Sequence, residues 1–259
     1  MLSETARCCA VIWASIRFLL CKCAHAGRLI VLLPLTVMSV AANSPPKECI
    51  TAANLRHQNT ARPWSFTQRK NVSRFEVRSG DHIAGDGAEK ERSEAFDTQK
   101  FAAGQSHRIS FEMLVESGRP NSAAWLTLVQ LQSTFDRGEN GHSAPVAVEM
   151  LGEHMRIVSR ADQRRVSVPN GFSFTEQYRD TGTIRRNRWY KIGMRFKFDP
   201  FNKGYLGVWR DGKPLVEYHG PLGFNDAEGA YFKQGVYRAS APEAFAAQFR
   251  RLSICTVEQ

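Results

Sequence analysis

Three short stretches of this 259-residue chain place polar side chains two positions apart, where they could act together on one substrate. The stretches are Arg92-Ser93-Glu94, Gln130-Leu131-Gln132 and Tyr231-Phe232-Lys233-Gln234-Gly235-Val236-Tyr237-Arg238. Residues two apart in a β-strand point to the same face. Each stretch therefore predicts a polar set on an open face and a second set packed inward. Any one of them alone would also fit an ordinary solvated sheet face.

Together, the residue types in these stretches suit β-elimination on a uronic acid. Arginine and amide side chains can bind the C5 carboxylate and stabilise the charge that develops when the C5 proton leaves. Tyr237 can act as the acid, or as acid and base if nearby cations such as Lys233 and Arg92 lower its pKa. This chemistry requires no metal and no organic cofactor. The sequence therefore predicts an enzyme acting on an acidic polysaccharide.

The elements that must hold these stretches are predicted to be strands. Residues 107–115 and 189–198 alternate apolar and polar side chains with a period of two, which is typical of half-buried strands. Asp211-Gly212 lies between two such runs and indicates a hairpin, because both residues tolerate positive φ. Further strands are expected at 125–132, 146–150, 155–159, 205–210, 231–237 and 249–257. About ten strands without helical spacers predict an all-β, single-domain antiparallel jelly roll, a concanavalin-like sandwich with a concave substrate groove.

The N-terminal segment, residues 1–42, is expected to be a signal peptide or leader. A basic residue, an apolar run and small residues follow one another from Arg28 to Ala42. A membrane anchor is the alternative, although the run is short for a span. The domain would then be residues 43–259, secreted or periplasmic. Because the leader holds four basic and one acidic residue, the net charge falls from +10 to +7, which still favours an acidic partner.

Only two cysteines follow the predicted leader, Cys49 and Cys255, one near each end of the domain. In an oxidising compartment such a pair is expected to form a disulfide that ties the ends together, and two unpaired thiols are the alternative. An apolar content of 42% and an aromatic content of 10% fit a folded protein and exclude a disordered chain.

The three stretches resemble the motifs of the jelly-roll polysaccharide lyases of the heparin lyase I-like group, which are related to alginate and glucuronan lyases. Those families carry Arg-x-Glu, Gln-x-His and Tyr-x-Lys-x-Gly-x-Tyr in this order, and the resemblance covers roughly residues 60–257. It implies that Tyr237 is the catalytic acid and that Arg92 and Gln130 neutralise the carboxylate. It also implies that Lys233 binds substrate or tunes Tyr237. The remaining predicted substrate-binding residues are Glu94, Tyr231, Arg238 and His142.

One position departs from the family pattern: Gln132 stands where the family has histidine. We retain Gln132 in the predicted catalytic set by its position, but an amide is not a useful proton acceptor. Three alternatives follow. Tyr237 performs both proton transfers in a syn elimination, another histidine supplies the base, or the protein binds without cleaving. His142, in the glycine-rich stretch that follows, is the nearest histidine in sequence and is otherwise an ordinary solvated loop residue.

Other function classes fit less well. A glycoside hydrolase of this fold would need paired carboxylates in a Glu-x-Asp run, and the sequence contains no such run. A non-catalytic glycan-binding module is the main rival. No recognised nucleic-acid motif is present, and no closely spaced His/Cys pairs after the leader predict a zinc site. A structural Ca²⁺ site remains open. We expect a monomer that acts on an acidic polysaccharide, without nucleic-acid partners or stable membrane insertion.

Overall fold

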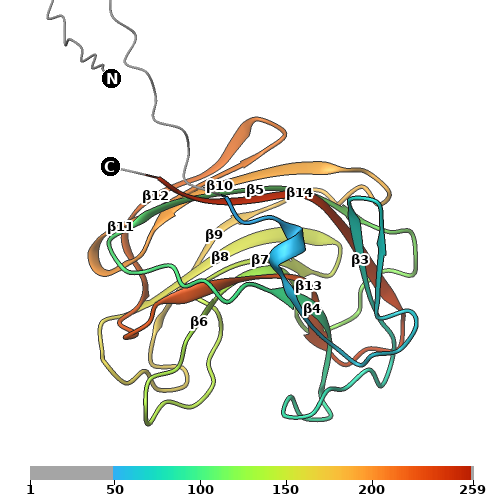
Figure 1. Cartoon of the computed structure of the whole chain (residues 1–259), viewed down its shortest axis with the longest axis horizontal. Helices are drawn as coiled ribbons and strands as arrows, with labels where there is room; N and C mark the ends of the chain where they lie inside the picture. Colours follow the sequence, from blue (N-terminus) through green and yellow to red (C-terminus); the bar gives the residue numbers. More distant parts are fainter. Residues whose placement is uncertain (1–48, 258–259) are drawn as a thin grey trace, which may run out of the picture. The chain divides into compact units, whose positions relative to one another are not determined.

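The structure is a computed structural model that describes residues 49–257 of the chain. Within this range, 14 strands form two curved sheets stacked face to face (Figure 1). A single-turn 3-10 helix, η1 (Ala52–Asn54), precedes the first strand. The strands pair antiparallel with one short exception, so the predicted all-β jelly roll is confirmed.

The outer sheet, at the top of Figure 1, has the strand order β2-β3-β14-β5-β10-β11-β12. Its strands are β2 (Phe66–Arg69), β3 (Val72–Val77), β14 (Phe245–Val257), β5 (Ser106–Val115), β10 (Tyr190–Lys197), β11 (Asp199–Arg210) and β12 (Lys213–Phe224). Asp211 and Gly212 join β11 to β12 with φ values of 53° and 82°, which confirms the predicted hairpin turn.

The inner sheet lies beneath the outer one and has the order β1-β4-β13-β6-β7-β8-β9. Its strands are β1 (Arg56–Asn59), β4 (Lys90–Phe96), β13 (Ala230–Ala239), β6 (Leu126–Ser133), β7 (Val146–Leu151), β8 (His154–Asp162) and β9 (Ser173–Arg179). The end of β12 leaves the outer sheet and pairs in parallel with β8 at Gly223 and Phe224, which joins the two sheets at one side.

The hydrophobic core fills the space between the sheets. Phe111 of β5 and Phe232 of β13 are both almost fully buried, and their ring centroids lie 6.4 Å apart across the sandwich. Phe249 of β14 packs on the same Phe111 ring. Burying one such side chain stabilises the fold by about 1.5–3 kcal/mol. The inward set of each strand therefore holds the inner sheet against the outer one and leaves the other face of the inner sheet uncovered.

Four strands were not predicted: β1, β2, β3 and β9. β1, β2 and β9 lie at sheet edges, and much of their surface remains exposed. Edge strands carry polar side chains on both faces, so the alternation that marks half-buried strands is weak in them.

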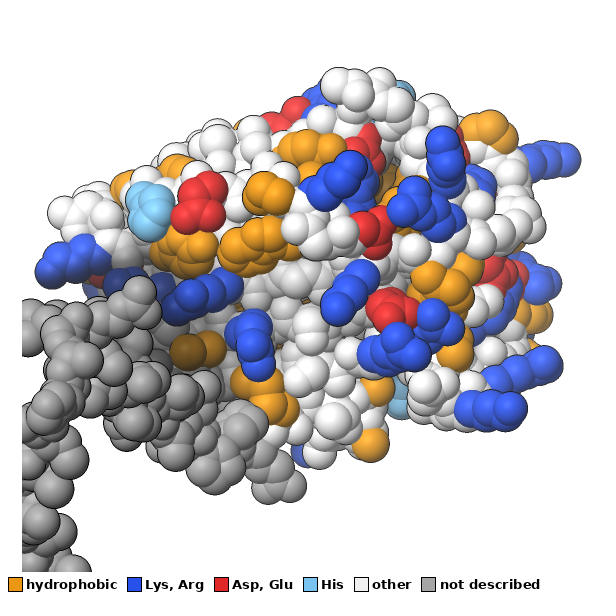
Figure 2. All heavy atoms as spheres, turned by 90° about the horizontal axis from the view of Figure 1, so that it is seen from above, with side chains coloured by type: hydrophobic (Ala, Val, Ile, Leu, Met, Phe, Trp, Pro, Cys, Tyr) orange, Lys and Arg blue, Asp and Glu red, His pale blue; other side chains and the backbone are white. Residues whose placement is uncertain are grey.

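The exposed face of the outer sheet carries part of the basic charge. Figure 2 views this face, where Lys and Arg side chains are scattered among acidic and apolar ones. Lys191 and Arg195 of β10 are exposed on it, and Arg186 in the preceding loop pairs with Glu153 at 2.8 Å. None of these residues lines the groove described below. These basic side chains are therefore hydrated on the face of the molecule that lies away from the groove.

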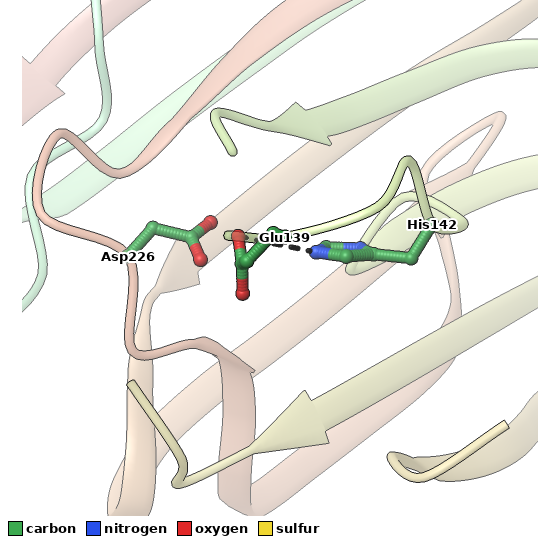
Figure 3. A group of neighbouring side chains, drawn as sticks. All are labelled: Glu139, His142 and Asp226. Atoms are coloured by element: carbon green, nitrogen blue, oxygen red, sulfur yellow. Dashed lines mark ion pairs between the residues drawn. The ribbon is translucent and has the colours of Figure 1, made fainter. Parts of the chain in front are cut away.

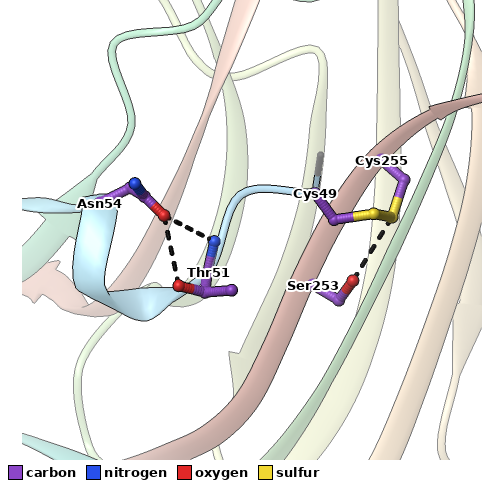
Figure 4. The surroundings of a disulfide bond; sticks show 5 residues. All are labelled: Cys49, Thr51, Asn54, Ser253 and Cys255. Atoms are coloured by element: carbon purple, nitrogen blue, oxygen red, sulfur yellow. Dashed lines mark hydrogen bonds between the residues drawn. A yellow bond between two sulfur atoms is a disulfide. The ribbon is translucent and has the colours of Figure 1, made fainter. Parts of the chain in front are cut away.

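A disulfide joins Cys49, just before η1, to Cys255 of β14, with their Cα atoms 4.7 Å apart (Figure 4). The predicted pairing is confirmed. The next turn is fixed by the Thr51 backbone N–H, which donates to Asn54 Oδ1 at 2.9 Å. The predicted leader and its alternative, a membrane anchor, lie outside the described residues. Within 49–257, no helix is long and apolar enough to cross a bilayer.

Candidate active site

A groove with a cavity volume of about 760 Å³ runs over the uncovered face of the inner sheet. Side chains of β4, β6, β7, β8 and β13 form its floor. Its walls come from the loops at residues 78–89, 134–145 and 163–172, which descend on either side of the inner sheet in Figure 1. The concave substrate groove expected from the sequence is therefore present in the structure.

Strand register brings the three predicted motifs together on the floor. Tyr237 of β13 lies opposite Arg92 of β4, and Lys233 of β13 lies opposite Gln130 of β6. Directly opposed residues on one face have Cβ atoms about 4.5–5.5 Å apart, so their side chains interact. Tyr231 lies opposite Gln132 in the same way. Residues more than 100 positions apart in sequence thus line one surface.

Gly235 explains why the third motif contains a glycine. Its φ of +142° is unfavourable for residues with a side chain, and a Cβ at this position would collide with the backbone carbonyl of Ser93. Glycine therefore permits the close approach of β13 to β4. The register of β13 against β6 also shifts between Gln234 and Tyr237, so the strand is irregular where it presents Tyr237.

A β-bulge changes one predicted assignment. Simple alternation places Trp125 on the face opposite Gln130 and Gln132, packed inward. The register of β6 against β7 shifts between Thr127 and Val129, and Trp125 and Thr127 line the groove together with the two glutamines. An extra residue in a bulge reverses the alternation beyond it. The prediction for Trp125 is therefore wrong, and its ring packs edge-on against Tyr237 with centroids 4.8 Å apart.

Glu94 is the buried centre of the polar cluster beneath the groove. Its carboxylate accepts hydrogen bonds from Arg92 Nη1 at 2.7 Å and Gln130 Nε2 at 2.6 Å, and it pairs with Lys233 Nζ at 2.8 Å. Burial raises the pKa of Glu94, but Lys233 and Arg92 outweigh this and hold it below its usual range. Glu94 is fully buried and does not line the cavity, which corrects its prediction as a substrate-binding residue. It instead contacts the three groups that do line the cavity.

Lys233 is held in the same network. Its ammonium group also donates to Gln58 Oε1 of β1 at 3.0 Å. Burial lowers the pKa of Lys233 while Glu94 opposes the change. The lysine therefore lines the groove with its charge already shared between two oxygen acceptors.

Arg92 has a second carboxylate partner that the sequence did not predict. Arg92 Nε and Nη2 donate to the two oxygens of Asp86 at 2.5 and 2.8 Å, a bidentate pair in the wall loop. Asp86 stands between Gly85 and Gly87, both with positive φ. Burial would lower the pKa of Arg92, but Glu94 and Asp86 raise it above its ordinary value. A carboxylate therefore already occupies the guanidinium edge that faces the groove.

Tyr237 lies against Arg92, with the guanidinium carbon 3.7 Å from the ring centroid. The sequence suggested that nearby cations would lower the pKa of this tyrosine. Instead, burial raises the pKa of Tyr237 to about 12, against the opposing effect of Arg92. Partial desolvation disfavours the phenolate more than one shared cation favours it. At neutral pH the phenol is protonated, as a proton donor must be.

Gln132 and His142 meet at the far wall of the groove. Gln132 Nε2 donates to the backbone carbonyl of His142 at 3.5 Å. Among the described histidines only His142 lines the cavity. Its side chain, however, is 1% exposed, and Nε2 points toward Glu139. The imidazole therefore does not offer a basic nitrogen to the groove in this structure.

Arg238 was predicted to bind substrate, and the structure places it elsewhere. Its side chain is fully buried on the opposite face of β13, where it pairs with Glu91 at 2.7 Å and Glu243 at 3.2 Å. Adjacent residues in a strand point to opposite faces, so Arg238 cannot share the groove face with Tyr237. The placement of Arg238 corrects the prediction.

The other end of the groove carries a second charged cluster. Arg156 and Arg160 of β8 both line the cavity and share Glu149 of β7, at 2.7 and 3.5 Å. Arg160 Nη1 also donates to the carbonyl of Ala144 at 2.7 Å. Sequence reasoning missed these residues because they lie in ordinary-looking strands without a motif. They extend the positively charged lining well beyond the three motifs.

Comparison with known proteins identifies the family. A family model described as polysaccharide lyase matches residues 48–251. The chain belongs to this polysaccharide lyase family. The predicted lyase is thus supported at the level of the family, while the heparin lyase I-like group is not specifically matched. No curated protein matches the chain.

Solved structures share the fold of this lyase at low sequence identity. An endo-β-1,4-glucuronan lyase from the fungus Trichoderma reesei aligns with a TM-score of 0.60 and 11% identity, covering 82% of this chain and 91% of that one. AlgAT5, an alginate lyase of family 7, aligns at 0.53 and 11% over 76% and 84%. An alginate lyase from Corynebacterium sp. aligns at 0.53 and 15% over 75% and 82%.

Proposed function

We propose that this polysaccharide lyase is secreted and cleaves an acidic, uronate-containing polysaccharide by β-elimination. One observation carries the proposal: Tyr237 lies on the guanidinium of Arg92 at the floor of an open groove, beside Gln130 and Lys233. The fold neighbours named as glucuronan and alginate lyases support a uronate substrate. The disulfide supports an oxidising compartment. The three motifs keep the heparin lyase I-like group as the proposed subgroup.

In this mechanism Arg92 and Gln130 bind the C5 carboxylate and stabilise the enolate-like intermediate. Tyr237 donates its proton to the leaving oxygen at C4. Because His142 turns its Nε2 away from the groove, we assign the removal of the C5 proton to Tyr237 as well, in a syn elimination. The cycle then starts from the phenolate of Tyr237, which takes the C5 proton and passes that proton to the C4 oxygen as the C4–O bond breaks. This transfer regenerates the phenolate. Glu94 and Lys233 act as positioning residues for Arg92 and Gln130.

The substrate carboxylate must compete with Asp86 for Arg92. Asp86 already makes the bidentate contact that a uronate would make, and Arg92 has its remaining partners in Glu94 and Gln58. Binding therefore begins with the exchange of one carboxylate for another. The flanking glycines let the backbone of the wall loop turn at Asp86 to allow this exchange.

The test is an assay of the full chain against glucuronan, alginate, heparin-like glycans and acidic bacterial exopolysaccharide. Ultraviolet absorbance of the C4–C5 unsaturated product reports cleavage. We expect absorbance on at least one polymer, and a loss of about 10²–10⁴-fold in kcat for Tyr237→Phe. Tyr205→Phe, on the outer sheet, is the matched control and should retain activity. Binding without absorbance on every polymer would instead identify a glycan-binding module.

A further inference from the structure

Behind the far wall of the groove, three side chains that no motif joins converge on one point. Glu139 and His142 come from the loop at residues 134–145, and Asp226 comes from the turn at residues 225–229 (Figure 3). One donor atom from each lies within 4.8 Å of the other two. His142 Nε2 is 3.8 Å from Glu139 Oε2, which is too long for a hydrogen bond.

His142 carries a polar atom that the protein leaves unused. Its side chain is 1% exposed, and Nε2 has no hydrogen-bond partner within residues 49–257. Nδ1 lies 3.3 Å from the carbonyl oxygen of Ser143. A carbonyl can only accept, so Nδ1 carries a proton, and in the neutral ring Nε2 then carries the lone pair. The lone pair points at the two carboxylates, where only a cation or a proton would satisfy it.

The ring and the first carboxylate are both held in place. The His142 ring packs between Phe135 and Phe224, with centroids 5.0 and 4.3 Å away. Glu139 accepts backbone N–H bonds from Asp136 at 2.8 Å and Ser167 at 2.6 Å. Metal-binding histidines commonly donate their second nitrogen to a carbonyl in this way, and ligating carboxylates are themselves hydrogen-bonded. The cluster therefore has both the candidate ligand atoms and the hydrogen bonds that commonly hold such ligands in place.

We propose that Glu139, His142 and Asp226 bind a divalent transition-metal ion of the zinc class. One imidazole nitrogen with two carboxylates suits zinc, whereas Ca²⁺ and Mg²⁺ prefer sites of oxygen alone. Bonds of about 2.0–2.2 Å place the donors of a tetrahedral zinc roughly 3.4 Å apart, so side-chain shifts on the order of 1 Å would complete the triangle. The sequence argued against zinc because it holds no closely spaced His/Cys pairs after the leader. The structure brings the three side chains together from two separate loops instead.

Such an ion would tie the turn between β12 and β13 to the loop between β6 and β7. Gln132 at the floor already donates to the backbone of His142, so the bound ion would fix the wall beside the second motif. This site lies apart from Tyr237 and Arg92 and requires no role in the elimination. The inference therefore does not depend on the proposed substrate.

The test is a calorimetric titration of the chelator-treated full chain with ZnCl₂, alongside Asp226→Asn and Glu139→Gln. Cysteines 8, 9, 21 and 23 precede the described residues and can hold zinc themselves, so the readout is a difference between proteins. We expect each variant to bind one equivalent fewer than the wild type, or to bind that equivalent roughly tenfold or more weakly. His219→Ala is the matched control, because His219 and Glu217 form an exposed pair at 3.5 Å on the outer sheet.

A measurement on the wild type removes any dependence on folding of the variants. Histidine-selective ¹⁵N NMR should show Nε2 of His142 shifting on addition of one equivalent of zinc, and excess Ca²⁺ should not reverse the shift. Equal stoichiometry and affinity in all four proteins, or an unchanged His142 resonance, would overturn the proposal. Displacement by Ca²⁺ would overturn it too, because it would indicate an oxygen-only site.

Discussion

Two arginines on paired strands, Arg92 and Arg238, face opposite sides of the inner sheet, and only Arg92 lines the groove. Each is bound by two carboxylates: Arg92 by Glu94 and Asp86, and Arg238 by Glu91 and Glu243. The Arg238 cluster is closed, with both salt-bridged partners and their backbone contacts inside the core. The Arg92 cluster opens onto the groove beside Tyr237. Two arginines with the same number of acidic partners can therefore differ in access, since only Arg92 lines the groove.

The largest effect should come from removing the closed cluster. Arg238→Gln leaves Glu91 and Glu243 buried without their cation, so we expect a loss of about 3–5 kcal/mol in the free energy of unfolding. Arg92→Gln should cost less, because Lys233 and Gln130 still bind Glu94. Denaturant unfolding of both variants measures the difference. Equal losses would show that the groove cluster is as structural as the buried one.

The same two variants should show the opposite order in activity: Arg92→Gln should lose more turnover than Arg238→Gln. Because Arg92 contacts the substrate in the proposed mechanism, Arg92→Gln should abolish turnover at temperatures where the variant stays folded. Arg238→Gln, assayed at a temperature where it is folded, should retain turnover. A folded Arg238 variant that lacks activity would show that Arg238 is required for turnover.

The next effect concerns pH. Burial holds the pKa of Tyr237 at about 12, so the phenolate fraction at pH 7 is very small and grows as pH rises. If Tyr237 removes the C5 proton, kcat/KM should increase about tenfold per pH unit on the alkaline side, up to the limit of folding. A tyrosine that acted only as acid would give a flat profile and then a fall. The pH profile of kcat/KM on the cleaved polymer distinguishes the two.

The smallest effect tests the replaceable partner. Asp86→Asn removes the charge that competes with the substrate carboxylate for Arg92 but preserves side-chain size. We expect KM to fall by several-fold, because the substrate carboxylate would no longer have to displace a bidentate carboxylate from Arg92. Steady-state kinetics on the cleaved polymer provides the measurement. A rise in KM would show that Asp86 positions Arg92 rather than competing for it.

The fold and the floor of the groove were predictable because both depend on local periodicity. Alternation marked most core strands, and the positive φ tolerated by Asp211 and Gly212 marked the hairpin. Motif spacing placed Arg92, Lys233 and Tyr237 on one face. Three features were not predictable, because each depends on tertiary structure: the bulge that turns Trp125 into the groove, the burial that raises the pKa of Tyr237, and the loop that delivers Asp86.

The prediction for Arg238 failed for a different reason. Its position next to Tyr237 was enough to show that it faces the other side of β13, since strand alternation applies to every residue of a motif. The zinc-class cluster lay beyond sequence reasoning altogether. Asp226 lies more than 80 positions from Glu139 and His142, and only the meeting of two loops brings the three side chains together.

The disulfide at the ends of the domain makes the described fold a covalent ring, with 206 positions of backbone between Cys49 and Cys255. A protease that cuts once in an exposed loop, such as the one that carries Asp86, opens this ring without releasing a fragment. The nicked protein would have new ends within the described fold, whose original two ends stay joined through the disulfide, as in a circular permutant. Cleavage of the backbone and separation of the pieces are therefore distinct events, and the second requires a reductant or another cut.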